Sequence, residues 1–432
     1  MTRRMMGWCL LAMGIVAGSS CTGRRVDPSL LWVGNNTTHL DDLLAARGQD
    51  GPSFDPSEKP VAVFDWDNTV IKNDVGDATT FWMLRNDKIL QPPNKNWATT
   101  SPFLTAAATV ALDAACATLA APGSPLPTST NAACADEILS IYSNGTTTGG
   151  ASAFAGYNRR TMEPAYAWAA ELGGGHTPAE IRGFAESAIT ENLAASEGAT
   201  QTVGTQSVTG YVRIYPQIED LIGALQDNGF DVWVVSASSQ HIVEPFAARV
   251  GIAADHVVGI RQTQDAGGKL TYDLQGCGDV PDGTNDGAGK FTGNSLITYI
   301  EGKRCWINKI IYGDTSATAR QRNEDPTKRI AFGAGDSDTD ISFLQDATAL
   351  RLAINRNKKE IMCNAYAGFG VGTWIINPMF IAPKPKLDSG YACSTTACKD
   401  AAGASVPCLD ENGMVLPNQQ DSVFCNDGVY CH

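Results

Sequence analysis

Short apolar runs alternate with longer amphipathic stretches along this chain, and their order predicts its fold. Four such runs, at 61–64, 231–238, 256–263 and 348–355, are short enough and apolar enough to be buried strands, and a fifth precedes GDSDTD. Residues 215–230 and 239–252, between these runs, repeat their apolar positions at helical spacing. Alternation of buried strands with amphipathic helices predicts an α/β fold: a Rossmann-like, doubly wound parallel sheet.

The pattern changes after the first strand and again near the end of the chain. Alanine-rich helical stretches separated by Gly, Ser, Thr and Pro fill residues 76–211 without a strong strand signal, which predicts an inserted helical domain, or cap. The α/β core is therefore expected at 61–75 and 212–380, with a β-rich insertion at 264–300. Residues 21–60 form an N-terminal extension, and 381–432 form a cysteine-rich tail with little periodicity.

The first twenty residues have the pattern of an export signal. Arg3 and Arg4 precede an apolar segment from Met5 to Ala17, which is too short to span a bilayer comfortably. The small residues before Cys21 resemble a bacterial lipoprotein cleavage site. We therefore expect a signal peptide at 1–20 and a periplasmic or outer-membrane-anchored protein of a Gram-negative-type bacterium. Membrane association is expected only through a lipid on Cys21.

The cysteine count agrees with export. Of twelve cysteines, Cys9 lies in the signal and Cys21 at the lipidation position, which leaves ten. Five disulfides in an oxidising compartment are the simplest interpretation, with Cys116 and Cys134 closing a local loop and the last cysteines crosslinking the tail. Zinc is the weaker alternative, because no CxxC pair occurs.

The charge balance argues against a nucleic-acid ligand. The formal net charge is −14, from 46 acidic and 32 basic residues, and no basic stripe interrupts the sequence. Such a chain repels phosphate backbones.

Polar side chains stand at the carboxyl ends of three predicted strands. Asp65 and Asp67 follow the first apolar run, Ser236 follows VWVV, and Asp336 begins the segment DSDTD. Burying an unpaired carboxylate is costly, so Asp65 and Asp67 must lie where their strand emerges, close to a cation or to hydrogen-bond donors. Sites in α/β sheets form at the carboxyl ends of the strands.

Each of these features also has a structural explanation when taken alone. Asp65 and Asp67 could be solvated turn residues, Ser236 could cap a helix, and Lys303 in EGKR could be a surface lysine. GDSDTD could be an acidic turn or a calcium loop. Together, however, they supply a carboxylate nucleophile, a second carboxyl group, donors for phosphoryl oxygens and carboxylates for Mg²⁺, which are the parts that phosphoryl transfer requires.

Four motifs in order, FDWDNT, VVSAS, GK at 302–303 and GDSDTD, resemble those of the haloacid dehalogenase-like superfamily, specifically its phosphatases. The resemblance covers roughly 60–75 and 211–380. It implies that Asp65 is the nucleophile that forms an aspartyl-phosphate, and that Asp67 is first the general acid and then the general base. Ser236 and Lys303 would bind the phosphoryl group.

The same resemblance implies a Mg²⁺ site and a substrate site. Asp65, the backbone carbonyl of Asp67, and Asp336 would bind Mg²⁺, with Asp340 supporting the metal or the lysine. Asn68 and Thr69 would orient the nucleophile loop beside the substrate. A carboxyl group at Asp67 argues against a true dehalogenase, because halide leaves without needing a proton.

The chain resembles most the secreted phosphorylcholine phosphatases, within the branch that includes phosphoserine phosphatase. Phosphocholine would need an aromatic cage, and Trp82 belongs to a group of cap aromatics that could form one or could simply be core. The group is Phe81, Trp82, Trp97, Tyr157, Tyr166 and Trp168. Asp74 and Asp77 could match a cationic substrate or could cap a helix.

Several alternatives stay open. A phosphotransferase or phosphomutase would use the same aspartyl-phosphate, and a surface lipoprotein could bind a ligand on the same fold without catalysis. Lys290 or Lys309 could replace Lys303, and residues 282–287 have partial calcium-loop spacing. The leading expectation is an exported, Mg²⁺-dependent phosphomonoesterase acting on a small phosphate ester.

Overall fold

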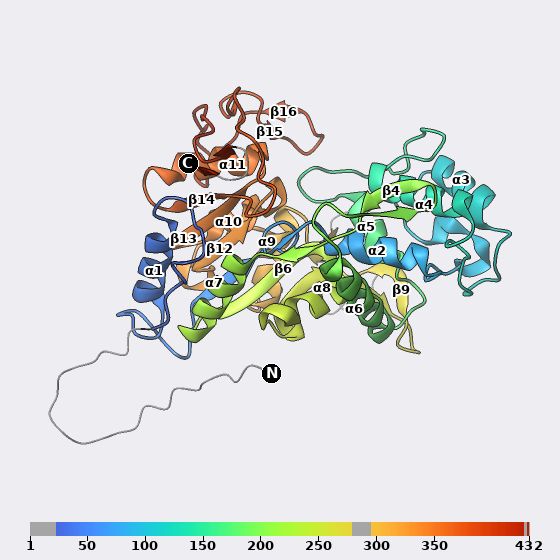
Figure 1. Cartoon of the computed structure of the whole chain (residues 1–432), viewed down its shortest axis with the longest axis horizontal. Helices are drawn as coiled ribbons and strands as arrows, with labels where there is room; N and C mark the ends of the chain where they lie inside the picture. The colour runs from blue at the N-terminus through green and yellow to red at the C-terminus, as the bar shows by residue number, and fades with distance from the viewer. Residues whose placement is uncertain (1–22, 279–294, 427–429, 432) are drawn as a thin grey trace, which may run out of the picture.

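A six-stranded parallel sheet forms the centre of the protein, for which a computed structural model describes residues 23–278, 295–426 and 430–431 (Figure 1). The strand order is β14-β13-β12-β1-β6-β7. The strands are β1 Val61–Phe64, β6 Asp231–Ser239, β7 Val257–Ile260, β12 Phe332–Gly335, β13 Leu350–Asn355 and β14 Trp374–Pro378. This confirms the predicted doubly wound α/β fold; β14 is a strand that the sequence pattern left unassigned.

Strand β1 lies inside the sheet, between two strands that come much later in the chain. Val61 pairs with Asp231 of β6, and Ala62 pairs with Phe332 of β12. From β1 the chain first winds outward through β6 to β7, and then crosses back to β12, β13 and β14. The strand order therefore reverses between β1 and β12, and ligands bind at such a switch point in open α/β sheets.

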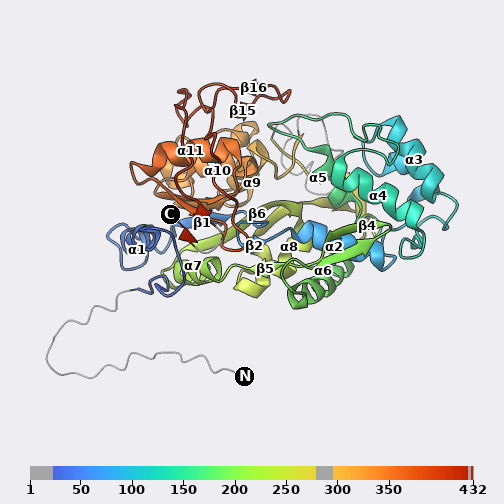
Figure 2. The same ribbon diagram turned by 45° about the horizontal axis from the view of Figure 1, so that its top comes forward.

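Helices cover both faces of the sheet, as Figure 2 shows. Alternate residues of β1 face opposite sides, so that Ala62 and Phe64 pack in one hydrophobic cluster while Val61 and Val63 pack in the other. One face is covered by α1 Asn36–Arg47, α7 Pro216–Asp227 and α8 Gln240–Ala247. The other face is covered by α9 Glu301–Ile310, α10 Ile341–Asp346 and α11 Lys359–Phe369.

The cap is inserted after the loop that follows β1. Its two connections to the core meet in a short antiparallel pair, β2 Ile71–Lys72 with β5 Arg213–Ile214. Its helices are α2 Val75–Arg85, α3 Ala106–Cys116, α4 Ala132–Asn144, α5 Pro164–Glu171 and α6 Pro178–Ala194. This mainly helical cap also contains a hairpin that the sequence pattern did not indicate, formed by β3 Thr200–Val203 and β4 Gln206–Thr209. The mostly exposed polar residues of the hairpin leave no hydrophobic run to detect.

The predicted β-rich insertion begins with a hairpin of β8 Gln262–Gln264 and β9 Leu270–Leu274. It continues as the pair β10 Cys277–Gly278 and β11 Ser295–Leu296. The proposed calcium segment, Lys290, the signal peptide and Cys21 all lie outside the described residues. None of the helices in the described part of the chain combines the length and the apolar character needed to cross a membrane.

Disulfides hold the tail, and one of them closes the cap loop as predicted. The bonds described are Cys116–Cys134, Cys277–Cys305, Cys363–Cys393 and Cys398–Cys408, and Cys425 is disulfide-bonded as well. In its described residues the tail forms two short strand pairs, β15 Cys398–Lys399 with β16 Ser405–Val406 and β17 Cys425–Asn426 with β18 Tyr430–Cys431. The bond between Cys363 in α11 and Cys393 attaches this irregular segment to the core.

Candidate active site

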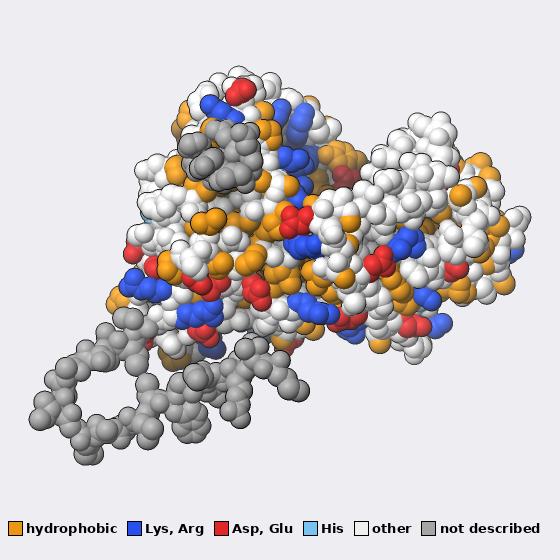
Figure 3. All heavy atoms as spheres, in the orientation of Figure 1, with side chains coloured by type: hydrophobic (Ala, Val, Ile, Leu, Met, Phe, Trp, Pro, Cys, Tyr) orange, Lys and Arg blue, Asp and Glu red, His pale blue; other side chains and the backbone are white. Residues whose placement is uncertain are grey.

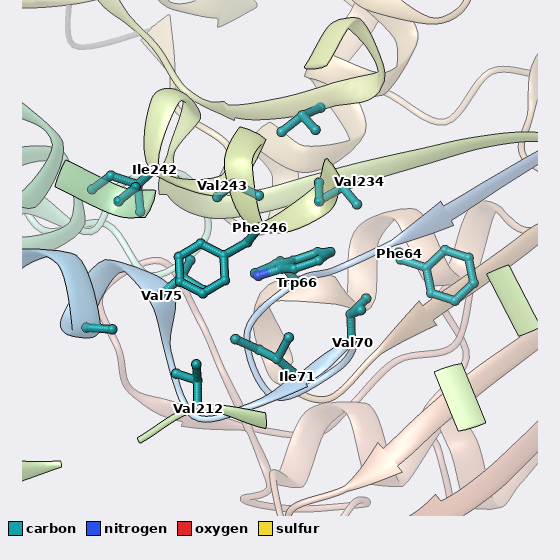
Figure 4. Close-up of a cluster of buried hydrophobic side chains, with 14 of the residues drawn as sticks. Phe64, Trp66, Val70, Ile71, Val75, Val212, Val234, Ile242, Val243 and Phe246 are labelled. Carbon is teal, nitrogen blue, oxygen red and sulfur yellow. The ribbon is translucent and has the colours of Figure 1, made fainter. Parts of the chain in front are cut away.

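The buried side chain of Trp66 anchors the loop that follows β1. Side chains alternate along an extended strand, so Trp66 points to the face opposite Asp65. It is fully buried among residues that include Val70, Val234 and Phe246 (Figure 4). The carbonyl oxygen of Trp66 accepts hydrogen bonds from the backbone N–H groups of the turn that follows, at 2.9 Å from Val70. This packing fixes where the two flanking aspartates stand.

Asp65 and Lys303 form a buried ion pair at the carboxyl end of β1. The Asp65 N–H still donates to the Ala334 carbonyl of β12 at 2.9 Å, and the residue is only 5% exposed. Lys303, in the first turn of α9, has no exposed surface. Its Nζ donates to Asp65 Oδ1 at 2.6 Å and to Asp340 Oδ1 at 2.7 Å. Burial, opposed by Lys303, raises the pKa of Asp65 to about 6.

Asp67 is held by two donors and is kept protonated more easily than an ordinary aspartate. Val75 N–H, at the start of α2, donates to its Oδ1 at 2.7 Å, and the Ser238 hydroxyl donates to its Oδ2 at 2.7 Å. Burial, and then the carboxylates of Asp74 and Asp65, raise the pKa of Asp67 well above its usual range. A carboxyl group of this kind suits general acid–base work near neutral pH.

Asp336 and Asp340 complete an acidic cluster opposite β1. Asp336 follows β12, and its Oδ2 accepts a hydrogen bond from Arg356 Nη1. Asp340 Oδ2 accepts from the backbone N–H groups of Asp336 and Ser337, each at 3.0 Å. The strand ends thus bring Asp65, Asp336 and Asp340 together as the sequence predicts.

This cluster fits a divalent cation. Ligand oxygens of Asp65, Asp336 and Asp340 lie within 4.8 Å of one another, and hard carboxylate oxygens suit Mg²⁺. The Thr69 hydroxyl, which carries one hydrogen, lies 2.9 Å from Asp65 Oδ2 and 3.1 Å from Asp336 Oδ1, so it satisfies only one of them at a time.

Asp65 Oδ2 and Asp336 Oδ1 are therefore the oxygens best placed to take the metal. Asp340 would support it indirectly, because both of its oxygens are engaged. The side-chain oxygens of Asp67 are engaged as well, which leaves its carbonyl oxygen for the metal.

A cavity of about 430 Å³ opens above Asp65 and Asp67, between the core and the cap. The space-filling view shows the molecule hollowed between these parts, with basic side chains gathered on the core side (Figure 3). The basic residues that line the cavity are Arg159, Arg356 and Lys358. Arg159 Nη2 donates to Asp338 Oδ2 at 2.8 Å, so this cap residue is paired to the core.

The cap side of the cavity is acidic and aromatic. Asp74 caps α2 by accepting from the Asp77 N–H at 2.9 Å, and Asp77 Oδ1 accepts from the Tyr142 hydroxyl at 2.8 Å. Burial, and then the Asp77 carboxylate, raise the pKa of Asp74 to about 7. Tyr166 meets Tyr299 edge to face, with ring centroids 5.7 Å apart, and both rings line the cavity.

Some predicted site residues stand elsewhere. Ser236 is fully buried, accepts a hydrogen bond from the Ser238 N–H at 3.1 Å and does not line the cavity. Trp82 stacks on Phe184, with centroids 5.8 Å apart, at the α2–α6 contact and away from the cavity lining. Asn68, with φ of 63°, lines the cavity, and its Oδ1 accepts from the Asn73 N–H and closes the loop.

Of the six cap aromatics considered for a cage, Tyr166 alone lines the cavity. Phe81, Trp97 and Trp168 are buried in the hydrophobic core, and Tyr157 is 46% exposed. The cavity is instead lined by Tyr142 and Tyr299, which the sequence analysis did not identify. Lys309 lies in contact with the Trp306 ring, 5.1 Å from its centroid, so Lys303 is the lysine that reaches Asp65.

Comparison with known proteins gives a family match and a fold. The family model of haloacid dehalogenase-like hydrolases matches residues 145–345. A search of curated proteins found no match. A solved structure of a conserved protein of unknown function from Anaerococcus prevotii is 22% identical, with a TM-score of 0.59, over 82% of this chain and 94% of that chain.

Two further solved structures were found at lower similarity. A protein of unknown function from Bordetella pertussis is 15% identical, with a TM-score of 0.40, over 73% of this chain and 96% of that chain. A substrate-bound phosphoserine phosphatase is 13% identical, with a TM-score of 0.28, over 68% of this chain and 86% of that chain. The matched family segment contains Ser238, Lys303 and Asp336, and β1 adds Asp65 beside them. Residues 145–345 of this chain are thus similar to haloacid dehalogenase-like hydrolases.

Proposed function

We propose that the protein is a Mg²⁺-dependent phosphomonoesterase that works through an aspartyl-phosphate on Asp65. The observation that carries the proposal is the pairing of two unlike carboxyl groups on one loop. Asp65 is held by Lys303, whereas Asp67, two residues on, has a pKa raised well above its usual range. Environments that separate the pKa values of two acids assign one as the nucleophile and the other as the proton donor.

In the first step, a carboxylate oxygen of Asp65 attacks phosphorus and the ester P–O bond breaks. Asp67 gives its proton to the departing alkoxide, and Ser238, 2.7 Å away, holds Asp67 in place. In the second step, Asp67 takes a proton from water, the water oxygen attacks phosphorus, and inorganic phosphate leaves while Asp65 is restored.

Mg²⁺, when bound by Asp65 and Asp336, would neutralise charge on the phosphoryl oxygens. Lys303 balances part of the negative charge on Asp65 and Asp340 throughout. Cap residues form one wall of the cavity, which would limit access of bulk water to the phosphoenzyme.

Phosphate release from a panel of phosphomonoesters, with Mg²⁺ and with EDTA, tests this proposal. Mg²⁺-dependent release that is lost in Asp65→Asn supports it, because an amide is a poor nucleophile. Folding of that variant is checked by its thermal melt. If the phosphoryl group passes to an added alcohol in preference to water, the protein is a phosphotransferase. No release and no transfer by folded, disulfide-bonded protein would point to a binding protein.

The substrate that we propose is a phosphate ester of a cationic alcohol, such as phosphocholine. The support is the cap wall, where Asp74 and Asp77 stand with the rings of Tyr142 and Tyr166. Carboxylates and aromatic faces both attract a quaternary ammonium group. The matched control is 3,3-dimethylbutyl phosphate, which has the shape of phosphocholine without its charge. A preference of about tenfold or more in kcat/KM for phosphocholine is expected, and equal rates would refute a cationic substrate.

We also propose that the protein is exported. The disulfides of the cap, core and tail support this, since such bonds persist in oxidising compartments. Fractionation of the producing cells, with mass measurement of the mature N-terminus, would show whether the chain is cleaved before Cys21 and whether Cys21 carries lipid.

A further inference from the structure

Arg356 stands at the switch point of the sheet but has no role in the mechanism described so far. It directly follows β13, the neighbour of the strand that supplies Asp336. The backbone around it is fixed, because the Asn355 side chain donates to Asp421 at 2.9 Å and to the Val423 carbonyl at 2.8 Å. The tail thereby sets the direction from which Arg356 enters the site.

The guanidinium has few partners in the protein. Within the described part of the chain, its one hydrogen-bond partner is Asp336 Oδ2. A guanidinium carries five N–H donors in a planar fork, so most of those of Arg356 are left for something else. The group is one-quarter exposed and lines both the main cavity and an adjoining polar cavity of about 220 Å³.

The residues first expected to bind the phosphoryl group do not reach this space. Ser236 and Lys303 are completely buried, and neither lines the cavity above Asp65. The Lys303 ammonium instead donates to the carboxylates of Asp65 and Asp340. Arg159 is paired to Asp338, whose other oxygen accepts from N–H groups at the start of α11. The third basic residue of the lining, Lys358, is exposed to solvent, which leaves Arg356 as the partly buried cation best placed to meet a phosphoryl oxygen from the cavity.

The two oxygens of Asp336 have different partners. Oδ1 faces Thr69 and the Asp65 side, where the cation would bind, and Oδ2 holds Arg356. A divalent cation on Oδ1 withdraws negative charge from the same carboxylate, which weakens its hold on the guanidinium. The metal and Arg356 thus compete for one carboxylate although they use different oxygens.

Resting on the function proposed above, we infer that Arg356 is a phosphate-binding residue that exchanges partners. Before a divalent cation binds, Arg356 neutralises Asp336. Once the cation binds Asp336, the guanidinium turns to the phosphoryl oxygens of the substrate and, after hydrolysis, to inorganic phosphate. Lys72 is buried near Arg356, and burial, followed by the positive charges of Arg356 and Lys384, lowers its pKa to about 8.

The inference makes a prediction in which two affinities move in opposite directions. In Arg356→Gln, Mg²⁺ should bind about threefold tighter or better, because a competing cation is gone. Inorganic phosphate, measured at saturating Mg²⁺, should bind about tenfold weaker or worse, because charge-assisted hydrogen bonds are lost. Isothermal titration calorimetry of the full chain with Mg²⁺ alone, and then with phosphate, measures both.

Two variants serve as controls. Lys358→Gln removes an equal charge from the lining of the same cavity without touching Asp336, and it should leave the Mg²⁺ affinity unchanged and weaken phosphate binding by about twofold at most. Arg356→Lys keeps the charge but loses the planar fork; its Mg²⁺ affinity should stay near that of the wild type while phosphate binding falls. It also keeps the test available if Arg356→Gln does not fold.

Parallel weakening of both ligands in Arg356→Gln would mean that Arg356 only positions Asp336, and would overturn the inference. So would unchanged phosphate affinity. Failure of the proposed function looks different: wild-type protein would then bind neither Mg²⁺ nor phosphate and would hydrolyse no ester, whatever residue stands at position 356.

Discussion

Replacing Lys303 by methionine should destabilise the protein in a strongly pH-dependent way. The ammonium is fully buried and is shared by Asp65 and Asp340, at 2.6 and 2.7 Å. Removing one partner of a buried ion pair typically costs about 3–5 kcal/mol, because the remaining charge is left uncompensated. Here two carboxylates lose their counterion, so we expect the upper part of that range at pH 8.

The sign of the pH dependence follows from proton binding. Burial already raises the pKa of Asp65 to about 6 in the wild type, and loss of the ammonium raises it further. Above about pH 4, the folded variant therefore binds more protons than the unfolded chain, and its stability falls as pH rises. Each extra proton contributes about 1.4 kcal/mol per pH unit.

From pH 5 to pH 8, a carboxyl group that stays protonated in the folded variant would cost it about 4 kcal/mol, whereas Asp65 in the wild type costs roughly 1–2 kcal/mol. The stability difference between the two proteins should thus grow by about 2–3 kcal/mol over this range. Urea denaturation followed by tryptophan fluorescence, in EDTA with disulfides intact, measures it at both pH values. Adding Asp340→Asn to Lys303→Met should recover part of the loss. A difference below about 1 kcal/mol, or one independent of pH, would refute this reasoning.

Three further predictions concern the loop, the cap contact and the acid. Trp66→Ala should lower the free energy of unfolding by about 3–5 kcal/mol and Trp66→Phe by less, as measured by urea denaturation; equal losses would contradict the packing role. Burial would raise the pKa of Glu244, but hydrogen bonds from His241, Arg182 and Gln240 lower it to about 2. Glu244→Gln should therefore be less stable than the wild type by about 1–3 kcal/mol at pH 7. In the same assay, this stability difference should shrink as the pH falls from 4.5 towards 2. Asp67→Asn should slow alkyl phosphate hydrolysis about 100-fold or more but p-nitrophenyl phosphate hydrolysis far less, since nitrophenolate leaves without a proton; equal slowing would remove the proton-donor role.

Much of the fold could be predicted from the sequence because its signals are local. Val61–Phe64 is an apolar run that ends in charge, and such a run in a chain of alternating helices specifies a central parallel strand. The meeting of Asp65 with Asp336 followed from the rule that strand ends share one edge. The β3–β4 hairpin was missed because its residues are polar and mostly exposed, which gives no hydrophobic period.

The rest of the site depends on geometry that a linear pattern does not contain. Both serines of SAS lie within β6, which continues to Ser239, and only the pairing of that strand determines that Ser238 rather than Ser236 meets Asp67. Tyr142 comes from a cap helix whose docking no local period specifies. Arg356, in contrast, directly follows the predicted strand 348–355, so the strand-end rule applied to every strand would have found it.

The position of β1 in the sheet also has a consequence for how the protein is made. The strand that carries Asp65 is synthesised first among the six, yet both of its neighbours, β6 and β12, follow the entire cap. During synthesis, Asp65 therefore has no sheet, no Lys303 and no Asp336 around it until most of the chain has emerged. Pairings across such long sequence separations form slowly. The catalytic centre is in this sense a late product of folding: a truncated or still-growing chain would have the nucleophile without the groups that make it reactive.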